Sequence, residues 1–161
     1  MLTFQRYREL CREASFALKL DDPDRLGNEG YMERDGIRVA LFFDEEIVSD
    51  RIFCYVDLGP IVEVARTKIF ERLLTLNLLS GTKTSGVYSI DPASGNAIFC
   101  VHLMNPDRIS GDELGGVLNA YVARAVQLQL SVLRDVDDLD FMQLANHMFG
   151  MDEIFSQSEL A

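Results

Sequence analysis

A leucine-rich segment in the middle of the chain constrains the fold more than any other feature. From Val64 to Arg72 the residues have the mixed polarity of an ordinary helix. Beyond Arg72 the leucines cover every side of the helix, and only Thr75 and Asn77 are polar. A helix end that is apolar on all sides has to be covered on all sides. One small sheet covers one side, so the sequence predicts a second covering body, which is either a longer C-terminal helix or a second copy of the protein.

A β-hairpin follows this helix. Strands are predicted at Val87–Ile90 and 97–104, joined by the turn Asp91-Pro92-Ala93-Ser94-Gly95. Asp suits the first position of such a turn, Pro presets φ at the second, and Gly accepts a positive φ at the exit. Apart from His102, the return strand is apolar on both faces, which predicts burial on both. The centre of the chain therefore has more apolar surface than a free monomer can cover.

The first third of the chain predicts a helix and a three-stranded antiparallel meander. Thr3 can cap a helix that runs to about Leu20, where Asp21-Asp22-Pro23-Asp24 ends it. Asp35-Gly36 is a strong two-residue hairpin signal between the first two strands. The alternation of apolar and polar residues predicts the three strands at 31–34, 37–44 and 51–58. Gly59-Pro60 then begins the central helix.

The last third predicts one long helix and a weaker one. Ser110 and Glu113 have the spacing of a capping box, and an apolar stripe continues from Asp112 to Arg134. A weaker helical pattern covers 139–149, and the tail after Gly150 is expected to be loose. The fold class is therefore α+β, in the order helix, three-stranded meander, helix, β-hairpin, helix. We expect a single domain over residues 1–161, with a core at 3–135 and a C-terminal extension at 136–161.

Composition excludes several classes of partner. The formal net charge of the 161 residues is −11, which argues against nucleic acid and against anionic membranes. No apolar run reaches about 18 residues, so membrane insertion is not expected. The N-terminus lacks the apolar core of a signal peptide. Three widely spaced cysteines, Cys11, Cys54 and Cys100, are consistent with a reducing cytoplasm.

Two segments have the composition of ligand loops but lack the required pattern. The segment Gly81–Gly86 resembles a phosphate loop, but Val87-Tyr88 follows where Lys and Ser or Thr are needed. A simple connection between helix and strand is preferred. The acidic run Asp135, Asp137, Asp138 and Asp140 resembles a calcium loop without its glycine and its closing Glu. A solvated turn with an Asp cap is preferred there.

Catalytic and metal-binding patterns are equally weak. His102 and His147 have no Cys or Glu at ligand spacing. The cysteines are most economically core thiols, and no Ser-His-Asp pattern is present. The sequence therefore predicts no enzyme, no metal and no cofactor.

Aromatic residues on the solvent side of the meander are the best candidates for a binding surface. Strand alternation places Phe42, Phe53 and Tyr55 on that side, and the first helix adds Phe4 and Tyr7 beside them. Isolated exposed aromatics are common on protein surfaces, so the alternative of no function stays open.

The order of elements and several short motifs resemble a known family. They are similar to the class I chaperones of type III secretion, the Tir chaperone family. The resemblance rests on Leu73-Leu74-Thr75-Leu76-Asn77, on Gly86 to Asp91, on Gly95 to Ile98 and on the helix Leu114 to Leu133. It covers roughly residues 3 to 135. The chain departs from the family in having no Trp in the last long helix and in continuing past residue 135.

The resemblance implies a function. Chaperones of this family are non-enzymatic cytoplasmic homodimers of Gram-negative bacteria that use no nucleotide. They hold the N-terminal chaperone-binding segment of an effector in a non-globular form and deliver it for secretion, with the secretion ATPase as a further implied partner. The segment wraps around the dimer, buries apolar side chains in grooves and often adds a strand to a sheet edge. The edge strand 31–34 is the expected site for such a strand.

The resemblance also implies that the central helix and the hairpin form the dimer contact. Core packing accounts for Ile69, Leu73 and Leu76, and the remaining apolar residues are assigned to the second subunit. They are Phe70, Leu74, Leu78, Phe99 and Val101. Two alternatives stay open: a regulatory or structural dimer without an unfolded client, and a domain that binds a small ligand.

Overall fold

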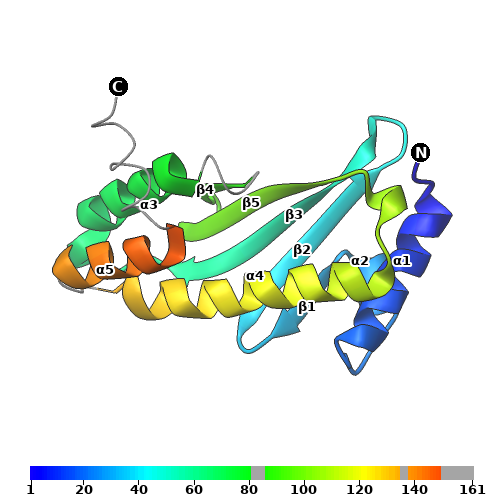
Figure 1. Ribbon diagram of the computed structural model, residues 1–161, viewed down its shortest axis with the longest axis horizontal. Helices are drawn as coiled ribbons and strands as arrows, with labels where there is room; N and C mark the ends of the chain where they lie inside the picture. The colour runs from blue at the N-terminus through cyan, green and yellow to red at the C-terminus, as the bar shows by residue number, and fades with distance from the viewer. Residues whose placement is uncertain (81–85, 135–137, 150–161) are drawn as a thin grey trace, which may run out of the picture.

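The structure is a computed structural model that describes residues 1–80, 86–134 and 138–149 (Figure 1). It is an α+β fold with one five-stranded antiparallel sheet, in the order β1-β2-β3-β5-β4, which confirms the predicted fold class. The elements are α1 (Phe4–Ala17), α2 (Arg25–Glu29), β1 (Tyr31–Arg34), β2 (Ile37–Asp44), β3 (Val48–Pro60), α3 (Arg66–Ser80), β4 (Val87–Ile90), β5 (Asn96–Met104), α4 (Gly111–Ser131) and α5 (Asp138–Phe149).

The meander and the hairpin form one continuous sheet. Strand β5 pairs with β3 from Arg51↔Met104 to Pro60↔Asn96, and β4 pairs with the free side of β5. The chain leaves β3, passes through a short 3-10 turn and α3, and returns to the sheet at β4. The hairpin therefore extends the meander, so the sheet is wider than either piece alone.

Strand β3 is longer than the sequence predicted. It begins at Val48 because the Asp44 side chain accepts hydrogen bonds from the N–H groups of Glu46 and Ile47, which closes a tighter turn. It also continues through Gly59, so the prediction that Gly59-Pro60 begins the helix is wrong. The pairing shifts register between Asp57 and Gly59, where Gly59 has a φ of 97°. A β-bulge of this kind lets pairing continue after an extra residue.

One helix was not predicted. Helix α2 is a five-residue helix that ends at Gly30, which adopts the left-handed conformation with a φ of 74°. The helix is too short for periodicity to reveal it. The glycine that ends it is, however, a typical signal of a helix C-terminus.

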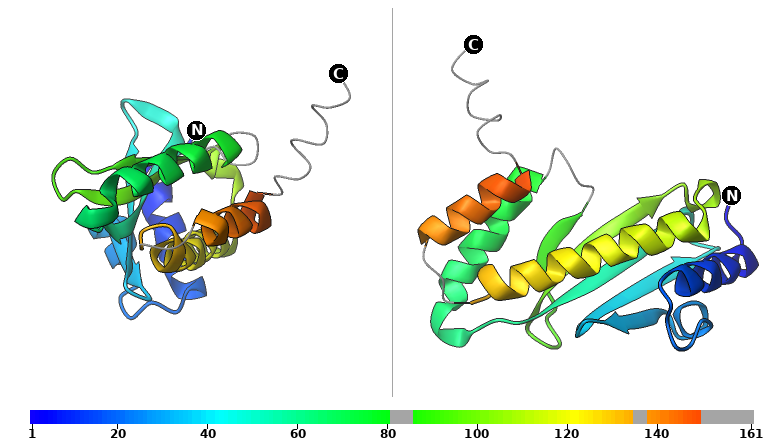
Figure 2. Two further views of the ribbon diagram at one scale, coloured as in Figure 1. Left: turned by 90° about the vertical axis from the view of Figure 1, so that its left-hand side faces the viewer. Right: turned by 60° about the horizontal axis from the view of Figure 1, so that its bottom comes forward.

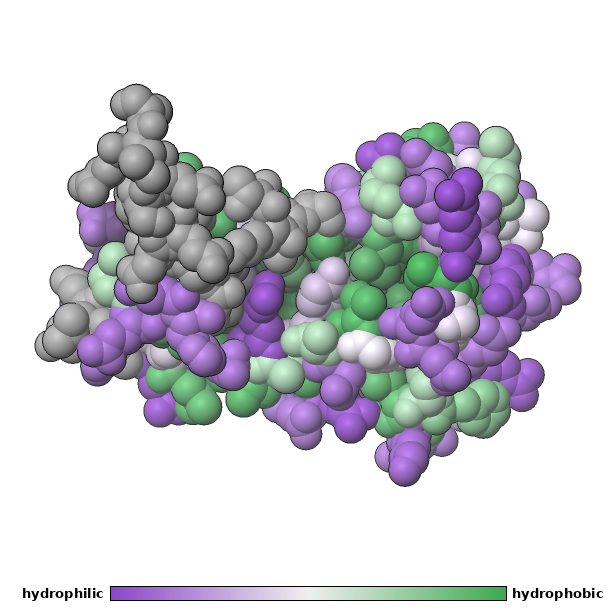
Figure 3. Space-filling view, in the orientation of Figure 1, coloured by the Kyte–Doolittle hydropathy of each residue, from purple (hydrophilic) through white to green (hydrophobic). Residues whose placement is uncertain are grey.

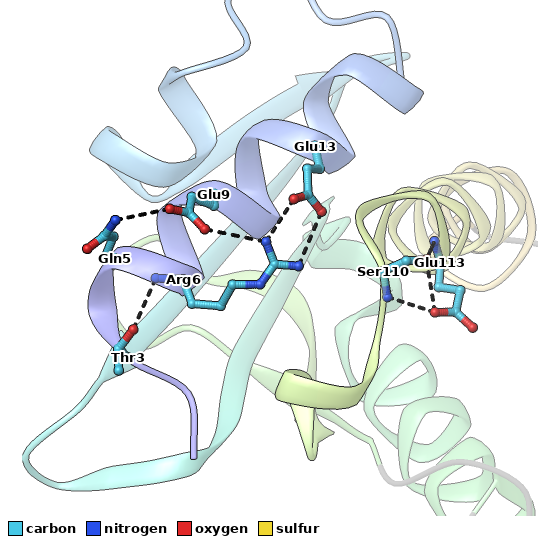
Figure 4. Close-up of polar contacts among 7 residues, drawn as sticks. All are labelled: Thr3, Gln5, Arg6, Glu9, Glu13, Ser110 and Glu113. Carbon is cyan, nitrogen blue, oxygen red and sulfur yellow. Dashed lines mark hydrogen bonds and ion pairs between the residues drawn. The ribbon is translucent and has the colours of Figure 1, made fainter.

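Both long helices begin with the predicted caps (Figure 4). The Thr3 hydroxyl accepts from the N–H of Arg6, and Ser110 and Glu113 form a complete capping box. On the exposed side of α1, the Arg6 guanidinium bonds to Glu13 and lowers the pKa of that carboxyl, with a second contact to Glu9. Helix α1 ends at Ala17, three residues before the predicted end.

The hydrophobic core lies between the sheet and helices α1 and α4, which pack on what we call its inner face. Alternate strand residues point into this core, and the corresponding helix residues meet them. The buried strand residues include Ile37, Val39, Leu41, Ile52, Cys54, Val56, Ala97, Phe99 and Val101. Figure 3 shows the molecule from the side of α4, where hydrophilic residues line the lower and right-hand margins and apolar residues show between them.

Helix α3 lies at the opposite end of the molecule from α1, with α5 beside it (Figures 1 and 2). Phe141 and Ala145 of α5 are buried, so a C-terminal helix supplies part of the cover that the leucine-rich segment was predicted to need. Leu74 and Leu78 of α3 nevertheless stay 67% and 77% exposed. The C-terminal helix alone therefore does not cover α3.

Close packing of α1 against α4 depends on glycine. A Cβ added at Gly111 would lie 2.1 Å from the Glu13 Cβ and 2.9 Å from its carbonyl carbon. We expect Gly111→Ala to lower the free energy of unfolding by about 1–3 kcal/mol, because the backbone of α1 has to move.

Gly116, on the same helix, is the matched control, because a Cβ there meets nothing within 4 Å. Gly116→Ala should be neutral or stabilising by up to about 1 kcal/mol through helix propensity. Urea denaturation of both variants measures the difference, and equal effects at the two positions would contradict the close packing.

Candidate functional site

The second face of the sheet, which we call the outer face, is rich in aromatic and apolar residues. Phe42 is 54% exposed and Tyr55 is 41% exposed, whereas Phe53 between them is half-buried. The Phe53 ring lies 6.1 Å from that of Phe42 and 4.7 Å from that of His102, between ring centroids. These three rings form an aromatic cluster across β2, β3 and β5. The sequence placed Phe42, Phe53 and Tyr55 correctly on this face.

The two aromatic residues predicted on α1 have opposite environments. Phe4 is 49% exposed, and its N–H donates to the Glu45 carboxylate in the β2–β3 turn. Tyr7 is buried: its ring stacks on Phe43 at 5.2 Å, and its hydroxyl donates to the Leu41 carbonyl at 3.4 Å. Tyr7 is one of the buried residues of α1, with Leu10, Cys11 and Ala14, whereas Phe4 is the first residue of the helix. The prediction that Tyr7 lies on the binding surface is therefore wrong.

Strand β5 contributes residues to the outer face that sequence reasoning missed. Met104 is 46% exposed, His102 is exposed, and Ile98 and Cys100 are only half-buried. The prediction that β5 is buried on both faces is therefore wrong within this protomer, because the described helices pack only on the inner face. The alternation of the strand had already separated the two sets of residues, and only the inner set is in the core.

A groove of about 340 Å³ continues the outer face toward the hairpin turn. Its apolar wall consists of Tyr55, Ile90, Ile98 and Cys100, and Pro92 of the hairpin turn also lines it. We call it the outer-face groove.

One edge of the sheet is open. Strand β1 is an edge strand, and its pairing with β2 runs from Tyr31↔Ala40 to Arg34↔Ile37. Antiparallel pairing alternates, so the backbone groups of Tyr31 and Glu33 point away from β2. Within the described part of the chain, no hydrogen bond to these outward groups is formed. A groove of about 450 Å³ follows this edge, lined by β1 and by the connection after α1.

The other edge is closed by a side chain. The Asn77 carboxamide of α3 accepts from the Tyr88 N–H at 2.6 Å and donates to the Tyr88 carbonyl at 3.0 Å. Asn77 thus pairs with β4 as a neighbouring strand would. Of the two edges, β1 is the one that remains available for an added strand.

The exposed side of α3 carries Phe70, Leu74 and Leu78, which we call the leucine face. Phe70 is half-buried, and the two leucines are the most exposed apolar residues of the helix. A groove of about 350 Å³ between this face and β4 is lined by Phe70, Leu73, Leu74, Tyr88, Ser89 and Ile90. We call it the hairpin groove.

Two residues assigned to the dimer contact are instead in the protomer core. Phe99 is 3% exposed, and its ring lies 5.0 Å from that of Tyr88 and 5.6 Å from that of Tyr121 on α4. Val101 is 2% exposed. Both belong to the inner-face set of β5 and are buried within the protomer, so they offer no surface to a second subunit. The assignment of Phe99 and Val101 to the dimer contact is therefore wrong.

The described residues offer little for catalysis. They contain no group of three or more His, Cys, Asp or Glu that could hold a metal ion. Burial raises the pKa of Cys11 and of Cys54 to about 12, so neither thiol is a nucleophile at neutral pH. Burial also raises the pKa of Cys100. None of the described helices has the length and apolar character of a membrane span.

Two predicted loops lie wholly or partly outside the described residues. These are the glycine-rich connection 81–86, of which only Gly86 is described, and the acidic run, of which only the side chain of Asp140 is described. The tail after Gly150 lies outside them too.

Comparisons with known proteins agree on the fold. A family model described as the Tir chaperone protein (CesT) family matches residues 36–129, more than half of the chain. A chain of the structure entitled "Crystal Structure of the ExsC-ExsE Complex" has a TM-score of 0.65 at 16% identity, over 84% of this chain and 100% of that chain. A chain of the "Structure of the HopA1-SchA Chaperone-Effector Complex" has a TM-score of 0.53 at 16% identity, over 76% and 92%. No curated protein sequence matches the chain.

The contact between Asn77 and Tyr88 is testable. We expect Asn77→Ala to cost about 1–3 kcal/mol of stability, because two backbone groups of β4 lose their partner. The rate of hydrogen exchange at the Tyr88 amide should increase as well.

Thr75→Ala is the matched control on the same helix, because the Thr75 hydroxyl bonds only within α3, to the Glu71 carbonyl. Thr75→Ala should leave the exchange rate of β4 unchanged. If Asn77→Ala also left it unchanged, Asn77 would not be closing this edge.

Proposed function

Because this chain belongs to the Tir chaperone protein (CesT) family, we propose that it is a type III secretion chaperone that holds the N-terminal segment of one or more effectors. The segment stays non-globular and soluble on its surface until it is delivered for secretion. On this proposal the protein acts by binding and not by catalysis, as the family and fold imply. Its place is the bacterial cytoplasm, and the secretion ATPase is a further partner.

The observation that carries the proposal is an uncovered outer face beside an open sheet edge. Phe42, Phe53 and Tyr55 offer apolar contact area on that face, and Phe4 adds to it from α1. The outward backbone groups of Tyr31 and Glu33 offer main-chain pairing at β1. An extended segment that adds a strand while burying apolar side chains needs both features. The fold is similar to that of a chain in a structure described as a chaperone-effector complex.

We further propose that the chaperone is a homodimer joined through α3 and β4. The leucine face and the hairpin groove supply an apolar surface that α5 does not cover. Ile90 of β4, which lines the hairpin groove, replaces Phe99 and Val101 as the contribution of the hairpin.

The two alternatives have less support. A site for a small ligand needs polar groups that converge in a pocket. Among the described residues, the buried polar side chains are Ser15, Arg72 and Ser80, which come from opposite ends of the molecule. A regulatory dimer without a client leaves the outer face without a role. Purification of the protein with its natural partners, followed by mass spectrometry, separates a client segment from a small molecule.

The dimer proposal predicts the effect of a charge on the leucine face. Leu74→Asp should give a folded monomer, because the side chain is 67% exposed in the protomer and a buried unpaired charge would cost several kcal/mol in the dimer.

Ile47→Asp is the control, since Ile47 is 76% exposed in the β2–β3 turn at the far end of the molecule from α3. Light scattering on both variants decides the question. A wild-type protein that is monomeric at micromolar concentration would refute the dimer.

The client proposal predicts the effect of removing two exposed aromatics. Phe42→Ser combined with Tyr55→Ser should weaken binding of the effector segment by at least about a hundredfold, since each buried aromatic contributes roughly 1.5–3 kcal/mol. Phe53 is left unchanged, because it is half-buried between Phe42 and His102 and its loss would disturb the protomer.

Val117→Ser on α4 is the control, because Val117 is partly exposed on a helix that packs on the opposite face of the sheet. Alkylation of Cys100, which lines the outer-face groove, gives a second measurement. A bound client should slow it. Full-strength binding by the folded double variant would place the client elsewhere.

A further inference from the structure

Helix α3 is held to the rest of the protomer from two sides. On one side Asn77 bonds to the edge of β4. On another side α5 lies along it, and both helices project from the end of the molecule that is remote from α1 (Figures 1 and 2). These two contacts add to the buried apolar side chains of α3, which are Ile69, Leu73, Leu76 and Leu79.

Arg72 is the centre of the contact between α3 and α5. The residue is 3% exposed, and the guanidinium carbon lies 5.3 Å from the centroid of the Phe141 ring. One of its N–H groups donates to the Arg134 carbonyl at 3.3 Å, just beyond the end of α4. A single side chain thus joins α3, the segment after α4, and α5. Phe141 is itself 5% exposed, so the stacked pair is buried.

This contact lies on the far side of α3 from the leucine face. Arg72 precedes Leu74 by two residues, which corresponds to about 200° around an α-helix. Helix α5 therefore supports α3 from behind and does not compete for Leu74 and Leu78, which stay exposed.

Helix α5 also lies outside the part of the chain that the family model matches, which ends at residue 129. The leucine face, in contrast, lies within it. The support behind α3 thus comes from residues outside the matched region.

We propose that α5 is an intramolecular clamp, which through Phe141 and Arg72 holds α3 in place and so sets how tightly the leucine face binds a second copy. This inference rests on the proposed dimer. A helix that is already fixed loses less conformational freedom when it associates than one that has to be ordered at that moment. The C-terminal region of the chain thereby controls dimer affinity without contributing to the contact itself.

The test uses the full-length protein and substitutions behind α3. Phe141→Ala removes the ring from the guanidinium, and Arg72→Lys keeps the charge but loses the planar group that stacks on the ring. Both should raise the dimer dissociation constant roughly tenfold, measured by analytical ultracentrifugation. Hydrogen exchange should rise in α3 and α5 and stay unchanged in α1. If the alanine variant does not fold, Phe141→Leu, which retains apolar volume but lacks the ring, is used in its place.

Met142→Ala is the matched control, because Met142 is the next residue of α5 and is 39% exposed. It should leave the dissociation constant unchanged. If the exchange of α5 rises in the Phe141 and Arg72 variants while the dissociation constant stays at the wild-type value, the clamp is refuted and the dimer stands. A wild-type monomer would refute the proposed dimer and this inference together.

Discussion

The pairing of Asn77 with the backbone of Tyr88 fixes the arrangement on which the rest of the structure depends. A carboxamide carries a donor and an acceptor at the spacing of a peptide group, so one side chain can satisfy both backbone groups of an edge residue. This contact ends the sheet at β4 and positions α3 there. Two consequences follow. Among the described residues, β1 is the more open edge of the sheet, and α3 is turned so that Leu74 and Leu78 face outward.

The two faces of the sheet serve different purposes. The inner face carries the stability of the protomer, since α1 and α4 pack on it and its strand residues are almost completely buried. The outer face has no described helix on it, and its aromatic and aliphatic residues stay partly in water. Exposed apolar area of this kind is a liability for solubility unless a partner covers it. The net charge of −11 counters that liability, because like-charged copies repel one another.

Local signals in the sequence predicted most of the elements. Asp35-Gly36, Thr3, the Ser110–Glu113 box and the turn ending at Gly95 each act over a few residues, and each forms as expected. The errors arose where burial depends on distant parts of the chain. Strand β5 has apolar residues on both faces, and the sequence cannot say that helices cover only one of them. This uncertainty explains the wrong assignment of Phe99 and Val101. Without knowing on which face of the sheet α4 packs, the sequence could not show which apolar residues of β5 belong to the core. The prediction for Tyr7 failed for a simpler reason: Tyr7 belongs to the apolar stripe of α1 with Cys11 and Ala14, and that stripe packs into the core.

The proposed dimer contact and the proposed client surface meet at β4. The hairpin groove and the outer-face groove share Ser89 and Ile90, so a second copy on one side of the strand borders whatever lies on the other. A substitution at Ile90 would therefore disturb both contacts and could not be assigned to either. Leu74 belongs only to the hairpin groove, and Phe42 lies two strands away from β5, toward the open edge. Separation of the two activities consequently requires substitutions at these outlying positions, because only there does a change in one surface leave the other intact.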